Sequence, residues 1–388
     1  MRKLPVPWAG PGDAVLYITL ILIAIGSINV FSASFVLADQ LLGDSYFFLK
    51  RHLIAFGLGL IGLVIAVRLP YRRIPRQLPL FVLAVAGMLV AVHFSGIDAN
   101  GARRWLKIGI QFQPSELAKL AAILTAATYL GPRLDRGRPI TIFSWPVVVT
   151  GIMGLLVLRQ PDMGTAVVIM GLCLFLYLPC GIPRRQIYGL LFCGAGATVY
   201  LVYAAAYRAE RILAWLDPWT YQQTSGYQTV QSLLAIGSGS LFGTGLGMGA
   251  SKFHYLPEAH TDFAFAVLCQ EMGFVGAALV LLLFALLAWY GIKIALKATD
   301  GFGIVLAVGT TFLVAGQAVG NIAMVTGILP VTGIPLPFIS FGGTSLIVNL
   351  VAIGLLINVG RSAGAKAASD RGSRNASRKL RLINPGRK

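Results

Sequence analysis

The sequence predicts an all-α integral membrane protein, a polytopic bundle of about ten transmembrane helices with a large extracytoplasmic loop between spans seven and eight. Of its 388 residues, 56% are hydrophobic and only 12% are charged, whereas soluble domains carry about 25% charged residues. Apolar runs of about 17–25 residues recur along the chain, which is the length a helix needs to cross a bilayer. A membrane β-barrel would instead alternate over segments of about ten residues.

The expected spans follow one another as 14–36, 53–67, 78–94, 114–130, 143–158, 164–179, 187–207, 263–292, 304–326 and 338–359. An even number of spans puts both termini on one side of the membrane. The first segment has no cleavage site at the right distance and is too long for the apolar part of a signal peptide, so we expect it to be retained.

The distribution of lysine and arginine sets the orientation. On the side of the termini lie 22 of the 32 basic residues, and the positive-inside rule makes that side cytoplasmic. The predicted organisation is therefore a cytoplasmic N-terminus (1–13), a ten-span membrane domain (14–360) with a large outer loop (208–262), and a cytoplasmic tail (361–388). The tail is rich in Ser, Gly, Ala and basic residues, so we expect it to be disordered and to bind anionic lipids. No aromatic or folded module accompanies it, and we expect no nucleic acid.

The most informative stretch is 254–276, where a polar segment with two carboxylates runs into a long apolar helix pattern. Asp262 is the last ionisable residue before that pattern, so it is expected at the boundary between water and hydrocarbon. One interpretation is that Thr261 or Asp262 only caps the helix. A cap does not explain the neighbouring Glu258 and His260, so a functional site is the other interpretation.

Basic residues on the outer side go against the rule that sets the topology, and they include Arg51, Arg103, Arg104 and Arg159. They are either solvated loop charges or parts of an anion site. Proline at 114, 161, 257 and 337 stands near the start of helices that enter the membrane from outside. Proline suits a first helical turn, and helix N-termini attract anions. The combination favours an anion site on the outer face.

Three further charged residues are expected inside spans four and six. Glu116 and Lys119 are spaced i, i+3, and an intramembrane lysine is costly unless it is paired or hydrated. They are predicted to form an ion pair facing the bundle interior; alternatively, Glu116 only complements the helix dipole while Lys119 extends toward the headgroups. Asp162 in the first turn of span six has the same dipole alternative.

Two glycine-rich segments need a structural interpretation. Residues 237–249 follow a helix-like segment and lack the lysine pattern of a phosphate-binding loop, so no nucleotide cofactor is evident. They are predicted to form a flexible or re-entrant loop on the outer leaflet. Residues 327–345 contain three prolines and are predicted to form broken backbone at the mouth of span ten, lining a cavity. Ser340 within this segment is a candidate substrate-binding residue.

Four motifs carry a family resemblance: QPSELAKL at 113–120, QPDMGTA at 160–166, YLPEAHTDFAFA at 255–266 and GIPLPFISFGGTSL at 333–346. Together and in this order they resemble the SEDS family (shape, elongation, division and sporulation). The resemblance implies a ten-span bundle in the bacterial cytoplasmic membrane that polymerises lipid II on its outer face. It also implies a class B penicillin-binding protein transpeptidase and other division proteins as partners, and it places the essential aspartate of the family on Asp262.

Within the family, residues 227–247 and 257–263 favour the division branch and a location at the division septum, while 333–343 also suits the elongation branch. The chemistry can be argued from the residues. A lipid-linked diphosphate is an activated donor, and the acceptor hydroxyl needs a general base, which we assign to Asp262. Candidate diphosphate ligands are Arg51, Arg103, Arg104, Lys119 and Arg159, and a divalent cation could bridge the diphosphate and the carboxylates. A lipid transporter and a noncatalytic scaffold are the alternatives.

Overall fold

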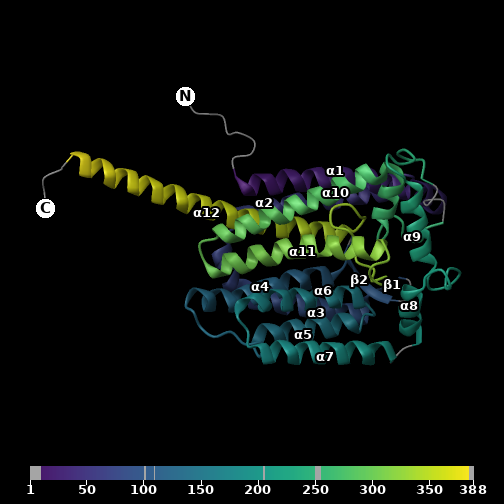
Figure 1. The fold of residues 1–388 in the computed structure, drawn as a ribbon, viewed down its shortest axis with the longest axis horizontal. Coiled ribbons are helices and arrows are strands. Elements are labelled where there is room, and N and C mark those ends of the chain that lie inside the picture. The colour runs from purple at the N-terminus through teal and green to yellow at the C-terminus, as the bar shows by residue number, and fades with distance from the viewer. Residues whose placement is uncertain (1–9, 100–101, 109, 204–205, 250–254, 384–388) are drawn as a thin grey trace.

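The computed structural model describes residues 10–99, 102–108, 110–203, 206–249 and 255–383. Most of the expected N-terminal segment 1–13, and residues 250–254 of the predicted outer loop, lie outside the described part. Ten helices match the predicted spans in position: α1 (Pro11–Leu42), α2 (Phe47–Arg68), α3 (Ile74–Ser95), α4 (Pro114–Asp135), α5 (Trp145–Leu158), α6 (Met163–Tyr177), α7 (Arg184–Tyr203), α10 (Ala264–Lys297), α11 (Gly301–Val325) and α12 (Gly343–Ile383). Figure 1 shows them packed side by side.

The prediction of a polytopic helical membrane protein is confirmed. Seven of these helices are long and apolar enough to cross a membrane, namely α1, α2, α3, α6, α10, α11 and α12. Helix α5 is apolar but shorter. The number of ten spans stays a prediction. Helix α1 begins and α12 ends at the same end of the bundle (Figure 1), as an even number of crossings requires.

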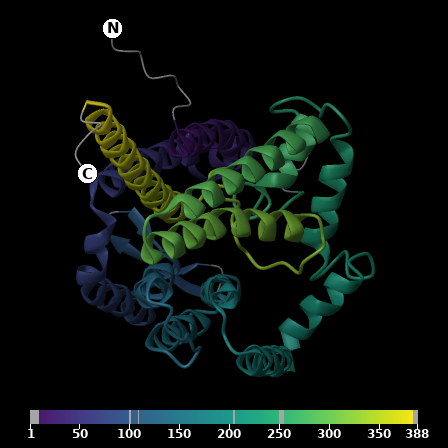
Figure 2. The ribbon, with the colours of Figure 1, turned by 60° about the vertical axis from the view of Figure 1, so that its left-hand side comes forward.

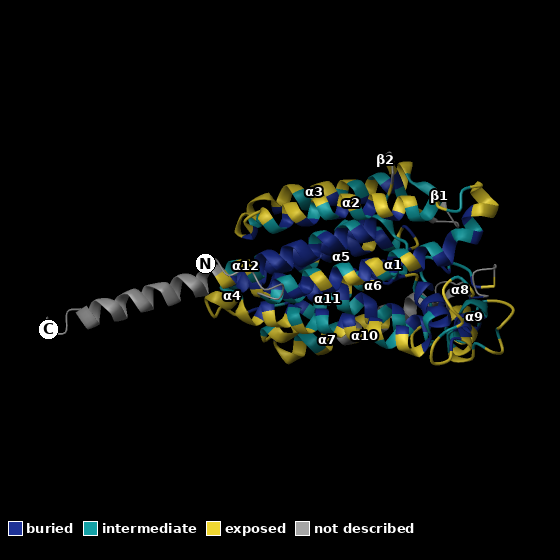
Figure 3. Ribbon diagram, turned by 90° about the horizontal axis from the view of Figure 1, so that it is seen from above, coloured by how far each residue is buried: buried dark blue, intermediate teal, exposed yellow. Residues whose placement is uncertain are grey.

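Burial separates the central helices from the peripheral ones. Helix α12 packs along α2 and also contacts α1, α10 and α11, while α4 packs against α11, α3 and α6. Most residues of α4 are buried. Helices α2 and α3 instead carry many exposed apolar side chains (Figure 3), among them Ile61 and Leu83. In a membrane protein such surfaces face lipid.

Two helices of the predicted outer loop lie across one end of the bundle. Helix α8 (Ala206–Leu216) runs from the margin of the bundle beside α7 toward α9 (Tyr227–Ser238), as Figure 2 shows. Helix α9 packs against α10. Between this layer and the long helices lie the connections that carry the predicted functional motifs.

A small antiparallel sheet between α3 and α4 was not predicted. It comprises β1 (Ile97–Ala99), β2 (Ala102–Ile108) and β3 (Ile110–Phe112), in the order β1-β2-β3. The all-α prediction is wrong in this one segment. Exposure alternates along β2, where Arg103 and Lys107 are exposed and Leu106 is buried, as suits a strand with one side exposed.

Helix α10 is broken at Gly273, where φ is 64° and ψ is −165°. A Cβ at this position would lie 2.3 Å from the backbone nitrogen of Gly243 and 2.6 Å from the carbonyl oxygen of Leu241, so only glycine fits. The glycine-rich loop after α9 fills the break through four backbone hydrogen bonds, from Thr244 to Gln270, Gly245 to Glu271, Phe274 to Ser240 and Val275 to Leu241. The break therefore anchors the loop and separates the first nine residues of α10, 264–272, from the rest of the helix.

The C-terminal tail differs from the prediction of disorder. Helix α12 continues without interruption to Ile383 and projects beyond the bundle (Figure 1). Starting a helix costs more than extending one, because each added residue brings its own hydrogen bond. The membrane-embedded part of α12 supplies the nucleus, and the alanine, lysine and arginine residues that follow have favourable helix propensity.

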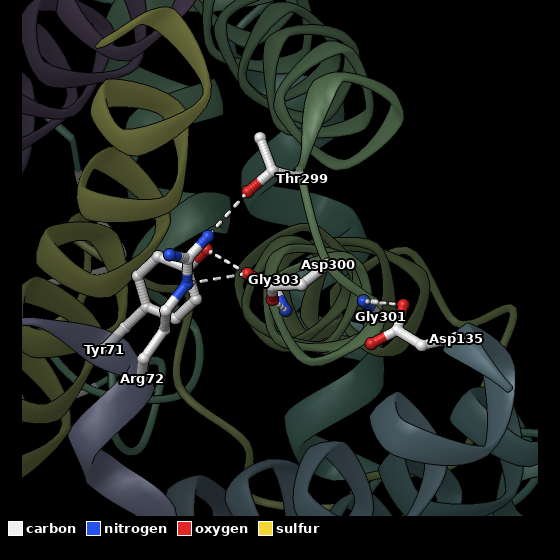
Figure 4. A network of polar contacts seen from close by, with 7 residues as sticks. All are labelled: Tyr71, Arg72, Asp135, Thr299, Asp300, Gly301 and Gly303. Atoms are coloured by element: carbon white, nitrogen blue, oxygen red, sulfur yellow. Dashed lines mark hydrogen bonds and ion pairs between the residues drawn. The ribbon is translucent and has the colours of Figure 1, made fainter. Parts of the chain in front are cut away.

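At the end of the bundle away from the sheet, Asp300 joins the start of α11 to the short 3-10 helix Tyr71–Arg73 that precedes α3 (Figure 4). Its carboxylate caps α11 by accepting from the backbone N–H of Gly303 at 2.8 Å. It also accepts from Tyr71 Oη at 2.8 Å and Arg72 Nε at 3.0 Å. The neighbouring Gly301 N–H donates to Asp135 Oδ1 at 2.7 Å. These contacts fix the spacing of α3, α4 and α11 far from the functional motifs.

Candidate functional site

Asp262 lies in the turn that leads into α10. The helix N-cap is Phe263, and no side chain caps it, so the interpretation that Thr261 or Asp262 caps the helix is wrong. Thr261 Oγ1 donates instead to Glu258 Oε2 at 2.7 Å. Glu258 has a φ of 53°, a left-handed conformation that costs a residue other than glycine about 1–3 kcal/mol and that is concentrated at functional sites.

The backbone around Asp262 is held from two other segments. Asn321 Nδ2 on α11 donates to the carbonyl oxygens of Asp262 and Ile334, both at 2.7 Å. The backbone N–H of Phe341 donates to the carbonyl oxygen of His260 at 2.9 Å. The segment between α11 and α12 is therefore tied to the turn that carries Asp262, and this tie fixes where the carboxylate points.

The sheet and the turn between α5 and α6 complete the site. Arg104 donates to the carbonyl oxygens of Gln160, at 3.4 Å, and Pro161. Gln113 Nε2 donates to Asp162 Oδ2 at 3.2 Å, and Asp162 Oδ1 caps α6 by accepting from the backbone N–H of Thr165 at 3.1 Å. Asp162 therefore does cap its helix, which was one of the two interpretations.

The turn between α5 and α6 also touches the segment that carries Gly333. A Cβ on Gly164 would lie 2.1 Å from the carbonyl oxygen of Thr332. On the same segment, a Cβ on Gly333 would lie 3.4 Å from Asp262 Oδ2. All four predicted motifs thus meet at one end of the bundle.

The electrostatics of this site raise the pKa of Asp262 to about 7. Burial is the main cause, since it disfavours the charged form. The negative charges of Glu258 and Asp162 act in the same direction, and the positive charge of Arg104 opposes them. A carboxyl whose pKa lies near neutral pH can accept a proton and release it again, which is what a general base requires.

His260 has a different character from the carboxylates. Its ring packs against Phe48, with ring centroids 4.6 Å apart, and against Phe341 at 5.9 Å. Burial lowers its pKa, although the charge of Glu258 acts in the opposite direction. His260 is therefore neutral at neutral pH and contributes packing to the site rather than positive charge.

Arg103 and Arg104, both candidate diphosphate ligands, lie on opposite faces of β2. Successive residues of a strand point to opposite faces. Arg104 is half-buried and contacts the turn between α5 and α6, whereas Arg103 is exposed and stands opposite Asp98 of β1. Arg104 alone of the two acts on the pKa of Asp262.

Three other candidates have contacts elsewhere within the described residues. The exposed Arg51 lies with Cζ 4.3 Å from the ring centroid of Phe47. Arg159 is exposed at the C-cap of α5. Ser340 Oγ accepts from the backbone N–H of Leu336 at 3.0 Å and so stabilises its own turn. No contact described for these three side chains reaches Asp262.

The predicted ion pair inside α4 is present. Lys119 Nζ lies 2.7 Å from Glu116 Oε1, and Lys119 and Glu116 are 1% and 3% exposed. With its amide oxygen turned toward Lys119, Gln317 of α11 accepts from Nζ at 2.8 Å. The alternative in which Lys119 extends toward the headgroups is wrong. Lys119 is six residues beyond Gln113, or about 9 Å along the helix. It therefore lies deeper in the bundle than the carboxylates of Asp162, Glu258 and Asp262.

The described residues contain no group of three or more His, Cys, Asp or Glu side chains placed to hold a metal ion. Glu258 and Asp162 both act on Asp262 electrostatically, but their oxygens are engaged by Thr261 and by Gln113 and Thr165. A divalent cation that bridges the diphosphate and the carboxylates stays a prediction.

Sequence reasoning missed three residues that position the site: Gln113, Gln317 and Asn321. The last two are polar residues four apart in an otherwise apolar segment, which places them on one helix face. Polar side chains within membrane helices often form hydrogen bonds to neighbouring helices, and this signal was available. Gln113 is the first residue of a quoted motif, but nothing in the sequence indicates its contact with Asp162.

Comparison with known proteins assigns the family. The sequence profile of the FtsW/RodA/SpoVE family, described as cell cycle proteins, matches residues 13–364. The chain belongs to this family, the SEDS family. Its relatives include stage V sporulation protein E of Bacillus subtilis, 42% identical over 90% of this chain and 97% of that protein. The probable peptidoglycan glycosyltransferase FtsW of Geobacter sp. strain M18 is 41% identical over 89% of this chain and 95% of that protein.

Solved structures agree with this SEDS assignment. A chain from a peptidoglycan synthase complex, described for its coordination of polymerization and crosslinking, superimposes with a TM-score of 0.74 at 31% identity, covering 90% of this chain and 97% of that one. The rod shape determining protein RodA of Thermus thermophilus superimposes with a TM-score of 0.65 at 30% identity, over 90% and 96% of the two chains. The fold is thus that of SEDS proteins.

Proposed function

We propose that this SEDS protein is a peptidoglycan glycosyltransferase that polymerises lipid II into glycan strands on the outer face of the bacterial cytoplasmic membrane. The observation that carries the proposal is Asp262, a carboxyl at the head of α10 with a pKa of about 7. Two carboxylates and one arginine from separate segments act on it. The names of the FtsW relatives support the same reaction.

The reaction joins an acceptor sugar hydroxyl to the anomeric carbon of a donor sugar and breaks the bond from that carbon to the lipid diphosphate. Asp262 in its ionised form takes the proton from the attacking hydroxyl. The diphosphate leaves with the electron pair of the broken bond, and Arg104 supplies positive charge beside Asp262 to stabilise it. Glu258 and Asp162 keep the pKa of Asp262 high enough for it to act as a base near neutral pH.

Septal synthesis during division is the proposed setting. The FtsW relatives and the sporulation relative support it, and RodA among the structural neighbours keeps the elongation role as the alternative. A crosslinking transpeptidase of the class B penicillin-binding type is the proposed partner, because a structural neighbour works in a complex that couples polymerization with crosslinking. The basic extension of α12 is proposed to lie on the cytoplasmic side and to bind anionic lipids.

Asp262→Asn tests the assignment directly. The change removes the base but keeps the shape and polarity of the side chain, so purified protein should polymerise lipid II in detergent about 10²–10⁴-fold more slowly. Its thermal unfolding should match that of the parent. Near-parental synthesis by this variant would refute the assignment.

The detergent assay also distinguishes a polymerase from a transporter. Transport needs a bilayer with two sides, so polymer that forms in detergent can come only from an enzyme. The transporter interpretation has little support from the geometry. Lys119, the residue that a polar route through the membrane would use, is 1% exposed and paired with Glu116. A noncatalytic scaffold would make no polymer under any of these conditions.

A further inference from the structure

A cavity of about 340 Å³ lies beside the site, and none of the reaction steps above uses it. Its lining comes from α8, from the turn before α9 and from the first turn of α9, and includes Arg211, Trp215, Ser225, Tyr227, Gln228 and Thr229. Its volume falls within the range of small-molecule binding sites, which begins at about 300 Å³. The cavity is therefore large enough for a sugar ring.

The cavity shares two walls with the catalytic site. Pro257, which directly precedes Glu258, forms part of one wall, and Val331 forms part of another. Val331 stands two residues before Gly333, the glycine next to Asp262 Oδ2. Trp215 Nε1 donates to the carbonyl oxygen of Gly327 at 3.1 Å, so α8 is tied to the same segment. A ligand in the cavity would lie next to the two loops that position Asp262.

The polar and aromatic groups of the lining suit a hydroxyl-rich ligand. Ser225, Gln228 and Thr229 supply hydrogen-bonding groups, and Trp215 and Tyr227 supply aromatic faces. Ser225 Oγ is buried and has no hydrogen-bond partner among the described residues, and such an atom is costly unless a ligand or water satisfies it. A pyranose ring presents apolar C–H faces and a polar rim, which matches a pocket built from aromatic faces and neutral polar groups.

Arg211 is the one charged residue among the described residues that line the cavity, and its side chain is exposed. Arg104, the cation that acts on Asp262, is not among the lining residues. We therefore assign the diphosphate to Arg104 and a sugar ring to the cavity.

We propose that this cavity is a subsite for an N-acetylated sugar of the glycan strand, beyond the sugar that reacts, and that it retains the strand between successive additions. The inference rests on the proposed polymerase function and extends it from one bond to repeated synthesis. Losing the subsite should release strands earlier and shorten the product.

The test uses the full-length protein with Asp262→Asn, so that no turnover occurs, in detergent. The probe is a peptide-free tetrasaccharide of alternating N-acetylglucosamine and N-acetylmuramic acid, and its binding is followed by saturation-transfer NMR. Trp215→Ala and Gln228→Leu should each weaken binding about tenfold, as the loss of one aromatic face or one polar contact predicts. Trp219→Ala, which changes an exposed tryptophan outside the lining, should bind as the parent does.

Product length is the second measurement. On the active background, Trp215→Ala and Gln228→Leu should give shorter strands from lipid II than the parent and Trp219→Ala give. If Trp215→Ala does not fold, Gln228→Leu decides the question, because it nearly preserves side-chain volume. The proposed subsite is refuted if Gln228→Leu, and Trp215→Ala if it folds, bind the tetrasaccharide as the parent does and make strands of parental length. It is also refuted if a free stem peptide displaces the tetrasaccharide. Cavity-dependent binding by a protein that makes no polymer would instead overturn the polymerase function and leave a glycan-binding site.

Discussion

Arg104 and Arg103 offer a matched pair of substitutions, because neighbouring residues of one strand face in opposite directions. Arg104 lowers the pKa of Asp262, whereas burial, Glu258 and Asp162 raise it, with a net value of about 7. An opposite charge near a carboxyl shifts its pKa by about 1–3 units. Since Arg104 is the smallest of the four influences, we take one unit, the lower end of this range, as the largest rise in the pKa that Arg104→Gln should cause.

The consequence for activity follows from the ionised fraction of Asp262. The base works in its ionised form, so the rate rises as pH increases through the pKa. At pH 7, about half of Asp262 is ionised in the parent and, after this largest rise, about a tenth in Arg104→Gln, so kcat should fall by up to about fivefold from this cause alone. The loss from this cause should disappear above about pH 9. If kcat of Arg104→Gln still levels off below the parental kcat at high pH, the remaining difference reports a lost contact between Arg104 and the diphosphate.

The assay is the initial rate of lipid II polymerisation by purified variants between pH 5.5 and pH 9.5, at saturating substrate. Arg103→Gln removes the same charge from the other face of β2, so its profile should superimpose on that of the parent. Arg104→Lys keeps the charge and should shift the profile less than Arg104→Gln does. Identical profiles for Arg103→Gln and Arg104→Gln would refute both the assignment of Asp262 as the titrating base and the orientation of the strand.

Two further predictions concern the framework around the site. Lys119→Met should destabilise the protein by about 3–5 kcal/mol because it leaves Glu116 buried without its partner. Adding Glu116→Gln should recover most of this loss, as measured by thermal unfolding. A double variant that is no more stable than Lys119→Met would contradict the pairing. Gly273→Ala puts a Cβ 2.3 Å from the nitrogen of Gly243 and should cost about 2–4 kcal/mol through lost hydrogen bonds in the break. The matched control is Gly171→Ala in helix α6, where an added Cβ meets open space. This variant should unfold at or slightly above the parental temperature. Equal effects of the two substitutions would show that the break does not require glycine.

Much of the fold follows from patterns that the sequence displays locally. The seven helices that can cross a membrane by length and composition were predictable because each is an apolar run whose length is set by the bilayer. The pair Glu116–Lys119 was predictable because i, i+3 spacing on a helix brings two side chains together wherever the helix lies. Asp262 stood out because an ionisable residue next to an apolar helix needs a reason to be there.

Other features depend on partners that are distant in the sequence. The break in α10 is required by Leu241 and Gly243, about thirty residues before Gly273, and a single glycine in an apolar run gives no sign of them. The opposite orientations of Arg103 and Arg104 follow only once that segment is known to be a strand. Here a signal was overlooked, since the dipeptide Asn-Gly at 100–101 is typical of a two-residue hairpin turn.

The burial of α4 bears on how the chain enters the membrane. This helix is not among the seven that are long and apolar enough to cross a bilayer by composition, and a lysine within a lone helix opposes insertion. Its neighbours α3, α6 and α11 surround it in the finished protein, and Gln317 of α11 satisfies Lys119. Since α11 is synthesised long after α4, the fourth span acquires its final surroundings only when the C-terminal third of the chain has been made. The buried position of α4 thus depends on a helix that is made after it.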